Sequence, residues 1–267
     1  MSLGRPVHES YLVDPLCKAV EKAWQAGIVV VVAAGNEGRN NSVGNQGYAT
    51  ITSTGNDPYV ITVGAMKTMA TANRGDDLIA SYSSKGPTLL DHIAKPDIVA
   101  PGNRTVAVST KGVSLLEKQF PSNMVTAAYF RMSGTSMATP VVSGAVALLL
   151  QKYPTLTPDQ VKARLMKTAT KSFPATSVAT DPATGQTYIS SYDLFTVGAG
   201  YLDIWGALNN TDVATGSALS PTAQYDPATG TVRLVFGSSV VWGSNVVWGT
   251  SGQPSGEAAG VLINGEN

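Results

Sequence analysis

Apolar side chains recur at helical spacing in two parts of the chain. Leu16, Val20 and Trp24 follow one another at four-residue intervals, which places them on one face of a helix. Asp14 is a favoured N-cap residue, and the proline after it suits the first helical position. A second helix start is predicted at 157–160, where Thr and Gln have the spacing of a capping box.

Two apolar runs predict buried strands. Residues 28–34 and 59–65 are rich in valine and isoleucine and lack a regular alternation with polar positions. Strands of this kind occur in parallel sheets that helices cover on both faces. The polar stretches 39–58 and 66–80 are predicted to be surface loops. A helix followed by a buried strand is half of an α/β unit, so the predicted fold class is α/β.

Residues 131–150 combine a polar turn with a long apolar run. The small residues around Gly134 predict a tight turn, and the apolar run predicts a buried helix that continues to about Lys152. A hydroxyl in the first helical turn lies near the positive end of the helix, among unpaired backbone N–H groups. Ser136 is therefore suited to act as a nucleophile whose product oxyanion needs hydrogen-bond donors.

Asn36 follows the first predicted strand directly, within Gly35-Asn36-Glu37-Gly38. Ligand sites in open α/β sheets lie beyond the carboxyl ends of the strands. This position gives Asn36 a functional interpretation, while a turn-capping asparagine is the structural alternative.

These segments resemble the conserved blocks of one protein family. Gly134-Thr135-Ser136-Met137-Ala138-Thr139-Pro140 is similar to the catalytic-serine signature Gly-Thr-Ser-Met-Ala-x-Pro of the subtilisin-like serine proteases, or subtilases. Residues 32–38 resemble the block that carries the oxyanion-hole asparagine of this family. Three further blocks are similar to blocks of the family and occur in the same order: 81–87, 95–102 and 198–207. The resemblance extends from residue 1 to about residue 208.

The resemblance implies a three-layer subtilisin-like fold, with a mostly parallel sheet between helices. It also implies a serine endopeptidase that acts by acyl transfer, with Ser136 as nucleophile and Asn36 as oxyanion donor. A peptide or protein substrate would bind by strand pairing. The residues that the resemblance implies for substrate binding are Ser2, Leu3, Gly4, Ala33, Ala34 and Gly35, with Gly55 as the floor of the pocket for the side chain before the cleaved bond.

This interpretation does not identify a catalytic base within the sequence. In subtilases the aspartate and histidine blocks precede the region matched here, so the N-terminal part of the domain is expected to lie outside this sequence. Neither His8 nor His92 has the Gly-Thr-His surroundings of the family. In subtilisin the loss of the histidine lowers kcat by about 10⁶-fold. This chain alone is therefore expected to be nearly inactive, and a missing N-terminal segment carrying Asp and His is expected as its partner.

Two alternatives stay open at this stage. A sedolisin-like acid peptidase would use a carboxylate as base, but such enzymes carry Gly-Thr-Ser-Ala where this chain has Met137. A non-catalytic peptide-binding or surface protein derived from a subtilase would keep the groove, but binding alone requires neither Ser136 nor Asn36.

The composition limits the classes of partner that this chain is expected to bind. Of 267 residues only 13% are charged and the formal net charge is zero, so nothing favours nucleic acid as a partner. The apolar runs are too short to span a membrane, and residues 1–6 do not resemble a signal peptide. An extracellular or secreted location is implied by the resemblance alone.

Cysteine content and possible cofactors add little. The single cysteine, Cys17, excludes an intrachain disulfide and is expected to be a buried, inert thiol. No cofactor is required by the predicted chemistry. Structural calcium is compatible with the resemblance, but no set of ligands has an identifiable spacing.

The composition changes after residue 208. Residues 209–267 are rich in Thr, Ser, Gly and Ala and contain two Val-Trp-Gly repeats, at 241–243 and 247–249. The predicted domains are therefore the C-terminal portion of a subtilase catalytic domain over 1–208 and a partly β-prone extension over 209–267.

Overall fold

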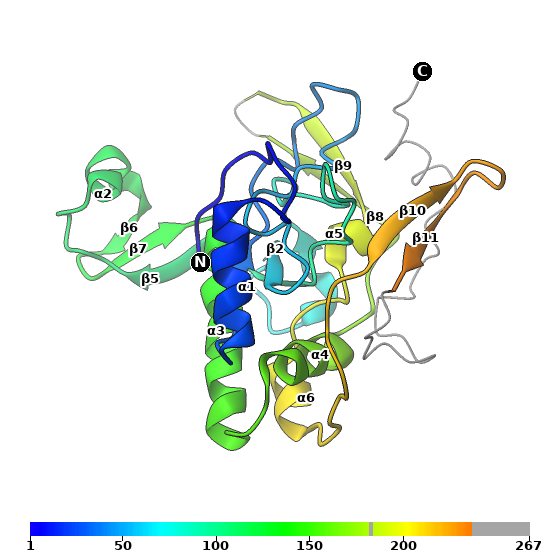
Figure 1. Ribbon diagram of the computed structural model, residues 1–267. Helices are drawn as coiled ribbons and strands as arrows, with labels where there is room; N and C mark the ends of the chain where they lie inside the picture. Colours follow the sequence, from blue (N-terminus) through cyan, green and yellow to red (C-terminus); the bar gives the residue numbers. More distant parts are fainter. Residues whose placement is uncertain (182–183, 237–267) are drawn as a thin grey trace.

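A small mixed sheet forms the centre of the fold in the computed structural model, which describes residues 1–181 and 184–236 (Figure 1). Strand β2 pairs in parallel with β1 and β4 and antiparallel with β3. The prediction of a mainly parallel α/β sheet is confirmed for β1, β2 and β4. The bounds are β1 (Val31–Ala33), β2 (Ile61–Lys67), β3 (Leu78–Ile79) and β4 (Ile98–Pro101).

Residues 66–80 differ from the prediction of a loop. Strand β2 continues to Lys67, a 3-10 helix η1 spans Arg74–Asp76, and β3 returns to pair with the end of β2. Strand β3 contains only two residues, so it has no alternation that a pattern in the sequence could reveal.

Alternation along β2 decides which side chains face each layer. Ile61, Val63 and Ala65 belong to one buried cluster, together with side chains of α1, α3 and α4. Met66 belongs to a second cluster with Val99, Tyr192 and Tyr201. Side chains cover both faces of the sheet, which is why its strands are apolar on both faces.

Three helices cover the first face: α1 (Pro15–Gln25), α3 (Thr135–Lys152) and α4 (Pro158–Thr168). Asp14 caps α1 by accepting a hydrogen bond from the Leu16 N–H, as predicted. The capping box of Thr157 and Gln160 at the start of α4 is also confirmed. Helix α3 ends at Lys152, as the apolar run predicted. Among the described residues, none of the helices combines the length and apolarity needed to cross a bilayer.

The C-terminal part of the described chain packs on the body of the protein. Strands β10 and β11 form an antiparallel hairpin, and Ser220 and Ala223 are buried. The proposed boundary after residue 208 stays a prediction, and the Val-Trp-Gly repeats lie outside the described residues. The elements of this part are β8 (Thr176–Thr180), β9 (Thr187–Ser191), α5 (Leu194–Val197), α6 (Ile204–Asn209), β10 (Thr222–Asp226) and β11 (Thr231–Val235).

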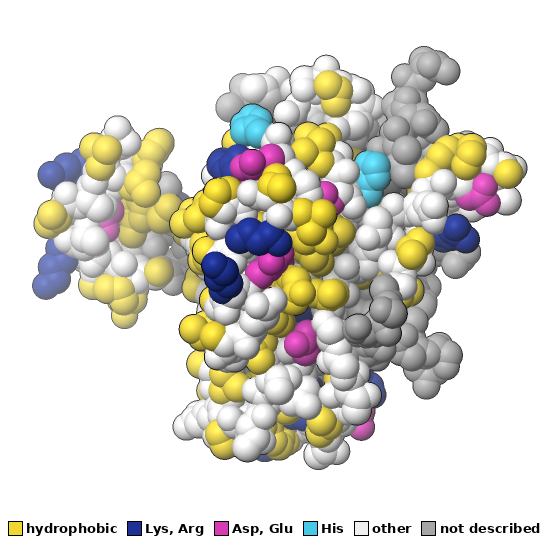
Figure 2. Space-filling model, in the orientation of Figure 1, with side chains coloured by type: hydrophobic (Ala, Val, Ile, Leu, Met, Phe, Trp, Pro, Cys, Tyr) yellow, Lys and Arg dark blue, Asp and Glu magenta, His cyan; other side chains and the backbone are white. Residues whose placement is uncertain are grey.

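Residues 103–132, here called the arm, project from the body between β4 and α3 (Figure 1). The arm carries a three-stranded sheet in the order β5–β7–β6, with α2 at its far end (Figure 1). Figure 2 shows hydrophobic and basic side chains over its surface. The arm consists of β5 (Thr105–Val108), α2 (Leu115–Gln119), the 3-10 helix η2 (Pro121–Asn123), β6 (Met124–Thr126) and β7 (Tyr129–Met132).

A fully buried charge cluster ties three distant segments together. The Lys95 ammonium lies 2.7 Å from one oxygen of Asp97, and the Lys162 ammonium lies 3.3 Å from the other. Ser220 donates a 2.5 Å hydrogen bond to Asp97, and Lys162 also donates to the Pro58 carbonyl at 2.8 Å. Burial opposes ionisation of Asp97, but the two ammonium groups hold its pKa below the ordinary value. The Asp97 carboxylate therefore supplies the negative charge that compensates the two buried ammonium groups.

We expect Asp97→Asn to lower the free energy of unfolding by about 3–5 kcal/mol, because it leaves two buried ammonium groups without a counter-charge. The matched control is Asp212→Asn, since Asp212 pairs with Lys167 at the surface, where the two side chains are 58% and 51% exposed. That control should cost less than about 1 kcal/mol. Urea unfolding measures both, and equal losses would contradict the role assigned to the buried cluster.

Candidate active site

Ser136 is the second residue of α3 and is partly exposed. The turn before it depends on Gly134, whose φ of 151° is a conformation that side chains with a Cβ rarely adopt. The Gly134 N–H donates to the Gly102 carbonyl at 2.9 Å, which fixes the turn to the end of β4. The turn and the helix together present the hydroxyl at the amino end of α3, as the sequence predicted.

Thr135 joins this turn to the loop after β1. Its backbone N–H donates to Asn36 Oδ1 at 2.9 Å, and its hydroxyl lies 3.1 Å from the same oxygen. The hydroxyl also lies 3.2 Å from both the N–H and the carbonyl of Gly35. Because Oδ1 is occupied as an acceptor, the Asn36 amide keeps its Nδ2 hydrogens for another acceptor. The positioning role of Thr135 was missed from the sequence, although it lies within the signature.

Two nitrogen atoms that can donate hydrogen bonds lie beside Gly134. A Cβ built on Gly134 would lie 3.4 Å from Asn36 Nδ2 and 3.7 Å from the Ser136 nitrogen. Within the described part of the chain, no acceptor is recorded for either of these N–H groups. Donors near a helix amino end favour a negative charge in the space between them. Asn36 Nδ2 and the Ser136 N–H are therefore neighbouring donors at the amino end of α3.

The N-terminal residues lie along the same region. Ser2 Oγ donates to the Ser136 carbonyl at 2.8 Å, and the Ala33 N–H donates to the Met1 carbonyl at 3.1 Å. Ser2, Leu3 and Gly4 are exposed, so their segment is accessible beside the nucleophile. Ala33 and its neighbour Ala34 are buried, and the Ala34 N–H already donates to Val63.

Thr52 lies between two of the predicted substrate-binding glycines. A Cβ on Gly4 would lie 2.4 Å from Thr52 Oγ1, and a Cβ on Gly35 would lie 2.8 Å from Thr52 Cγ2. A cavity of 510 Å³ opens here, lined by Gly4, Thr52 and Glu37 among others. Gly55 is buried, and a Cβ built on it would lie 3.0 Å from the Ala33 carbonyl oxygen. Sequence reasoning missed Thr52 because it lies in a polar loop without any motif.

Both histidines lie on the surface. The side chains of His8 and His92 are exposed, and among the described residues neither has a recorded hydrogen bond to the Ser136 hydroxyl. The backbone of His92 is part of the packing, since its carbonyl accepts from the Ala223 N–H at 2.7 Å. These contacts give neither histidine a role as base for Ser136 in this structure.

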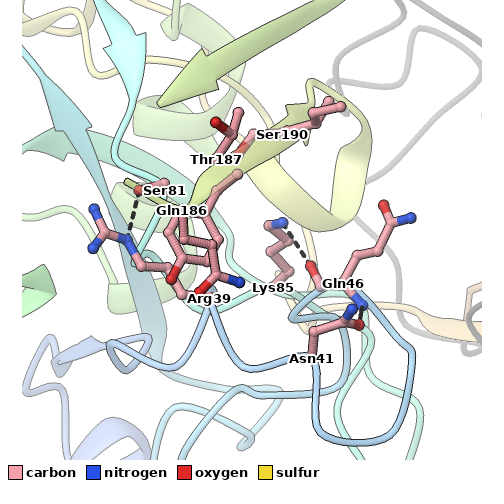
Figure 3. Close-up of a pocket in the computed structure, with 11 residues that line it drawn as sticks. Arg39, Asn41, Gln46, Ser81, Lys85, Gln186, Thr187 and Ser190 are labelled. Carbon is pink, nitrogen blue, oxygen red and sulfur yellow. Dashed lines mark hydrogen bonds between the residues drawn. The ribbon is translucent and has the colours of Figure 1, made fainter. Parts of the chain in front are cut away.

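A second cavity, of 390 Å³, lies between the 38–46 loop and β9 (Figure 3). Its two cationic side chains already have partners: Arg39 pairs with Asp181 at 3.0 Å, and Lys85 donates to the Gln46 carbonyl at 2.8 Å. Figure 3 shows the hydrogen bond from Arg39 to the Ser81 hydroxyl and the one from Lys85 to Gln46. Neither Ser136 nor Asn36 lines this cavity.

Further groups with reactive or metal-binding chemistry are Cys17 and the acidic side chains in the described part of the chain. Cys17 is buried, as expected, and burial raises the pKa of its thiol to about 12, which keeps it protonated and inert. In the part of the chain that the structure describes, no three side chains of His, Cys, Asp or Glu come together as a metal site.

The packing at Gly35 yields a test of this geometry. Gly35→Ala should lower the free energy of unfolding by about 2–5 kcal/mol, because φ is +112° and the new Cβ would lie 2.7 Å from Ser84 Oγ. Gly27→Ala is the matched control: φ is +89°, but nothing lies within 4 Å of the new Cβ, so only about 1–2 kcal/mol should be lost. Thermal and urea unfolding measure the difference, and equal losses would mean that Ser84 and Thr52 do not pack against Gly35 as described.

Comparison with known proteins shows the family of this chain. The model of the subtilase family matches residues 1–188. The serine protease AprX of Bacillus subtilis is 48% identical over 174 residues, which cover 64% of this chain and 37% of AprX. Subtilisin DY of Bacillus licheniformis is 41% identical over 170 residues, with 64% of this chain and 48% of that protein covered. The chain thus spans between a third and a half of the length of these relatives, and it belongs to the subtilase family.

Proposed function

We propose that this chain provides the nucleophile and the oxyanion hole of a serine endopeptidase. The observation that carries the proposal is that Asn36 Nδ2 and the Ser136 nitrogen both lie beside Gly134, next to the nucleophile in the chain. Membership of the subtilase family and the similarity to named serine proteases support the same reaction class.

The chemistry proposed is acyl transfer. Ser136 Oγ attacks the carbonyl carbon of a peptide bond, and the carbonyl oxygen becomes an oxyanion as the C–O bond forms. Asn36 and the Ser136 N–H donate hydrogen bonds to that oxygen. The nitrogen of the cleaved bond leaves with a proton, and water later releases the acyl group from Ser136.

The serine proton needs an acceptor, and we assign that role to residues outside this sequence. Both histidines of the chain are exposed, and no contact of either with Ser136 is recorded in the described residues. A segment that supplies a histidine and an orienting aspartate would complete the triad. Without it, the chain should turn over substrate very slowly, because the oxyanion hole alone provides a small part of the rate acceleration.

The substrate is proposed to be an extended polypeptide. The exposed segment of Ser2, Leu3 and Gly4 is an edge that a substrate strand could join. The cavity at Gly4, Thr52 and Glu37 is the candidate pocket for a substrate side chain. Location outside the cell and structural calcium stay predictions from the family resemblance.

Labelling with a fluorophosphonate probe tests the nucleophile. The chain alone should label weakly, labelling should rise on addition of a segment with the family's Asp and His blocks, and Ser136→Ala should abolish it. Ser143→Ala is a suitable control, since Ser143 is an exposed hydroxyl further along α3. Labelled protein is measured by in-gel fluorescence and mass spectrometry.

The outcomes separate the alternatives. Absence of labelling under both conditions would reject the peptidase and favour a peptide-binding module. Activity of the completed enzyme that peaks well below pH 5 would favour a sedolisin-like acid peptidase instead.

Replacement of the oxyanion donor tests the second half of the site. In the completed enzyme, Asn36→Ala should lower kcat by about 10²–10³-fold with little change in KM, as for removal of an oxyanion donor in subtilisin. Asn41→Ala is the control, because Asn41 is an exposed asparagine of the same loop that does not line the cavity at Gly4, and its replacement should change kcat less than about twofold. An unchanged kcat for the Asn36 variant would show that the oxyanion is stabilised elsewhere.

A further inference from the structure

The arm, residues 103–132, exposes an unusual amount of apolar surface. Eight of the 24 large exposed apolar side chains in the described residues belong to it, although it is a small part of the chain. Exposed apolar side chains that gather in one segment mark a surface for interaction with another molecule. The eight are Val106, Val108, Val113, Leu115, Leu116, Phe120, Val125 and Tyr129.

The interior of the arm tip is polar. The Glu117 carboxylate is buried and accepts hydrogen bonds from the Ser109 hydroxyl at 2.8 Å, the Thr110 N–H at 2.7 Å and the Gly112 N–H at 2.9 Å. A hydrogen bond from the Thr110 hydroxyl is the main reason why the pKa of Glu117 falls to about 2. The loop is thus built around a carboxylate, and its apolar side chains face outward.

Strand β5 forms a free edge of the arm sheet, which has the order β5–β7–β6. The Ser109 N–H donates to the Ala128 carbonyl, and the same register pairs Ala107 with Phe130. Hydrogen-bonded pairs alternate in an antiparallel ladder, so the backbone groups of Val106 and Val108 point away from β7. These valines are 49% and 83% exposed, and no charged side chain interrupts β5. Such an edge is a template for another strand.

The edge is joined directly to the candidate active site. Gly102, three residues before β5, accepts a hydrogen bond from the Gly134 N–H at 2.9 Å. The Arg104 N–H donates to the Ser133 hydroxyl at 2.9 Å. A strand held on β5 would therefore lie near the turn that presents Ser136.

The charge of the arm indicates what kind of strand binds along β5. The arm carries four basic residues, Arg104, Lys111, Lys118 and Arg131, and its only acidic residue is the buried Glu117. A second copy of the chain pairing through the same edge would bring two cationic arms together, which costs free energy. A neutral or acidic segment with apolar side chains avoids this repulsion.

We propose that the arm captures unfolded polypeptide substrates, with an extended apolar segment added as a fourth strand along β5. Backbone groups of Val106 and Val108 pair with the segment, and their side chains pack against its apolar residues. Folded proteins rarely expose such a segment, so the arm selects unfolded chains. The inference rests on the proposed function for the cleavage that follows, whereas the capture itself is a binding event.

Binding to a Ser136→Ala variant of the chain tests the capture step. The probe is fluorescent α-lactalbumin, reduced and carboxymethylated so that it stays unfolded. Val108→Pro, which removes an outward N–H without loss of a sheet bond, and Val108→Lys should each raise Kd at least tenfold. Val178→Lys is the matched control, since Val178 is 59% exposed on β8, and should change Kd less than twofold. Native α-lactalbumin should bind much more weakly than the unfolded probe.

The proposal is overturned if neither Val108 variant changes Kd while both stay folded by circular dichroism. It is also overturned if both variants abolish a concentration-dependent dimer in sedimentation and leave the probe's Kd unchanged, because a second copy would then occupy the edge. The Ser136→Ala background cannot be acylated, so the result is independent of the chemistry. A failure of fluorophosphonate labelling together with Val108-dependent binding would reject the peptidase and leave the capture surface standing.

Discussion

The hydrogen bonds of Thr135 are the contacts on which the candidate active site depends. Thr135 binds Asn36 through both its backbone N–H and its hydroxyl, and it also contacts Gly35. These contacts attach the amino end of α3 to the loop that follows β1. They also settle the orientation of the Asn36 amide, because its oxygen is already used. Ser136 and Asn36, a hundred residues apart in the chain, are thereby held on either side of one turn, with the Ser136 nitrogen and Asn36 Nδ2 both beside Gly134.

The body of the protein supports this junction with a buried ionic cluster. Asp97 lies just before β4 and receives Lys95, Lys162 from α4 and Ser220 from the segment before β10. The Thr62 N–H of β2 donates to the same carboxylate at 2.7 Å. The cluster therefore connects the sheet with the C-terminal part of the described chain, and this coupling makes the residues after 208 relevant to the core.

The arm differs from the body in how it is stabilised. Its tip is organised by the hydrogen bonds of Glu117, and its apolar side chains remain exposed, whereas the body buries its apolar residues around β2. A segment held by polar contacts can present an apolar surface without collapsing onto it. The base of the arm is joined to the turn at Gly134, because the Gly134 N–H donates to the Gly102 carbonyl and the Arg104 N–H donates to the Ser133 hydroxyl.

The sequence by itself determined the local elements and the chemical residues. Helix caps at Asp14 and Thr157, the buried strands and the start of α3 follow from short-range patterns, because capping and periodicity depend on neighbouring residues. The choice of Ser136 and Asn36 also came from local motifs. Only the tertiary structure decided the positions of Thr52 between two glycines, of β3 on β2, and of the free edge of β5. These features are contacts between segments far apart in the chain, and no local pattern encodes which segments meet.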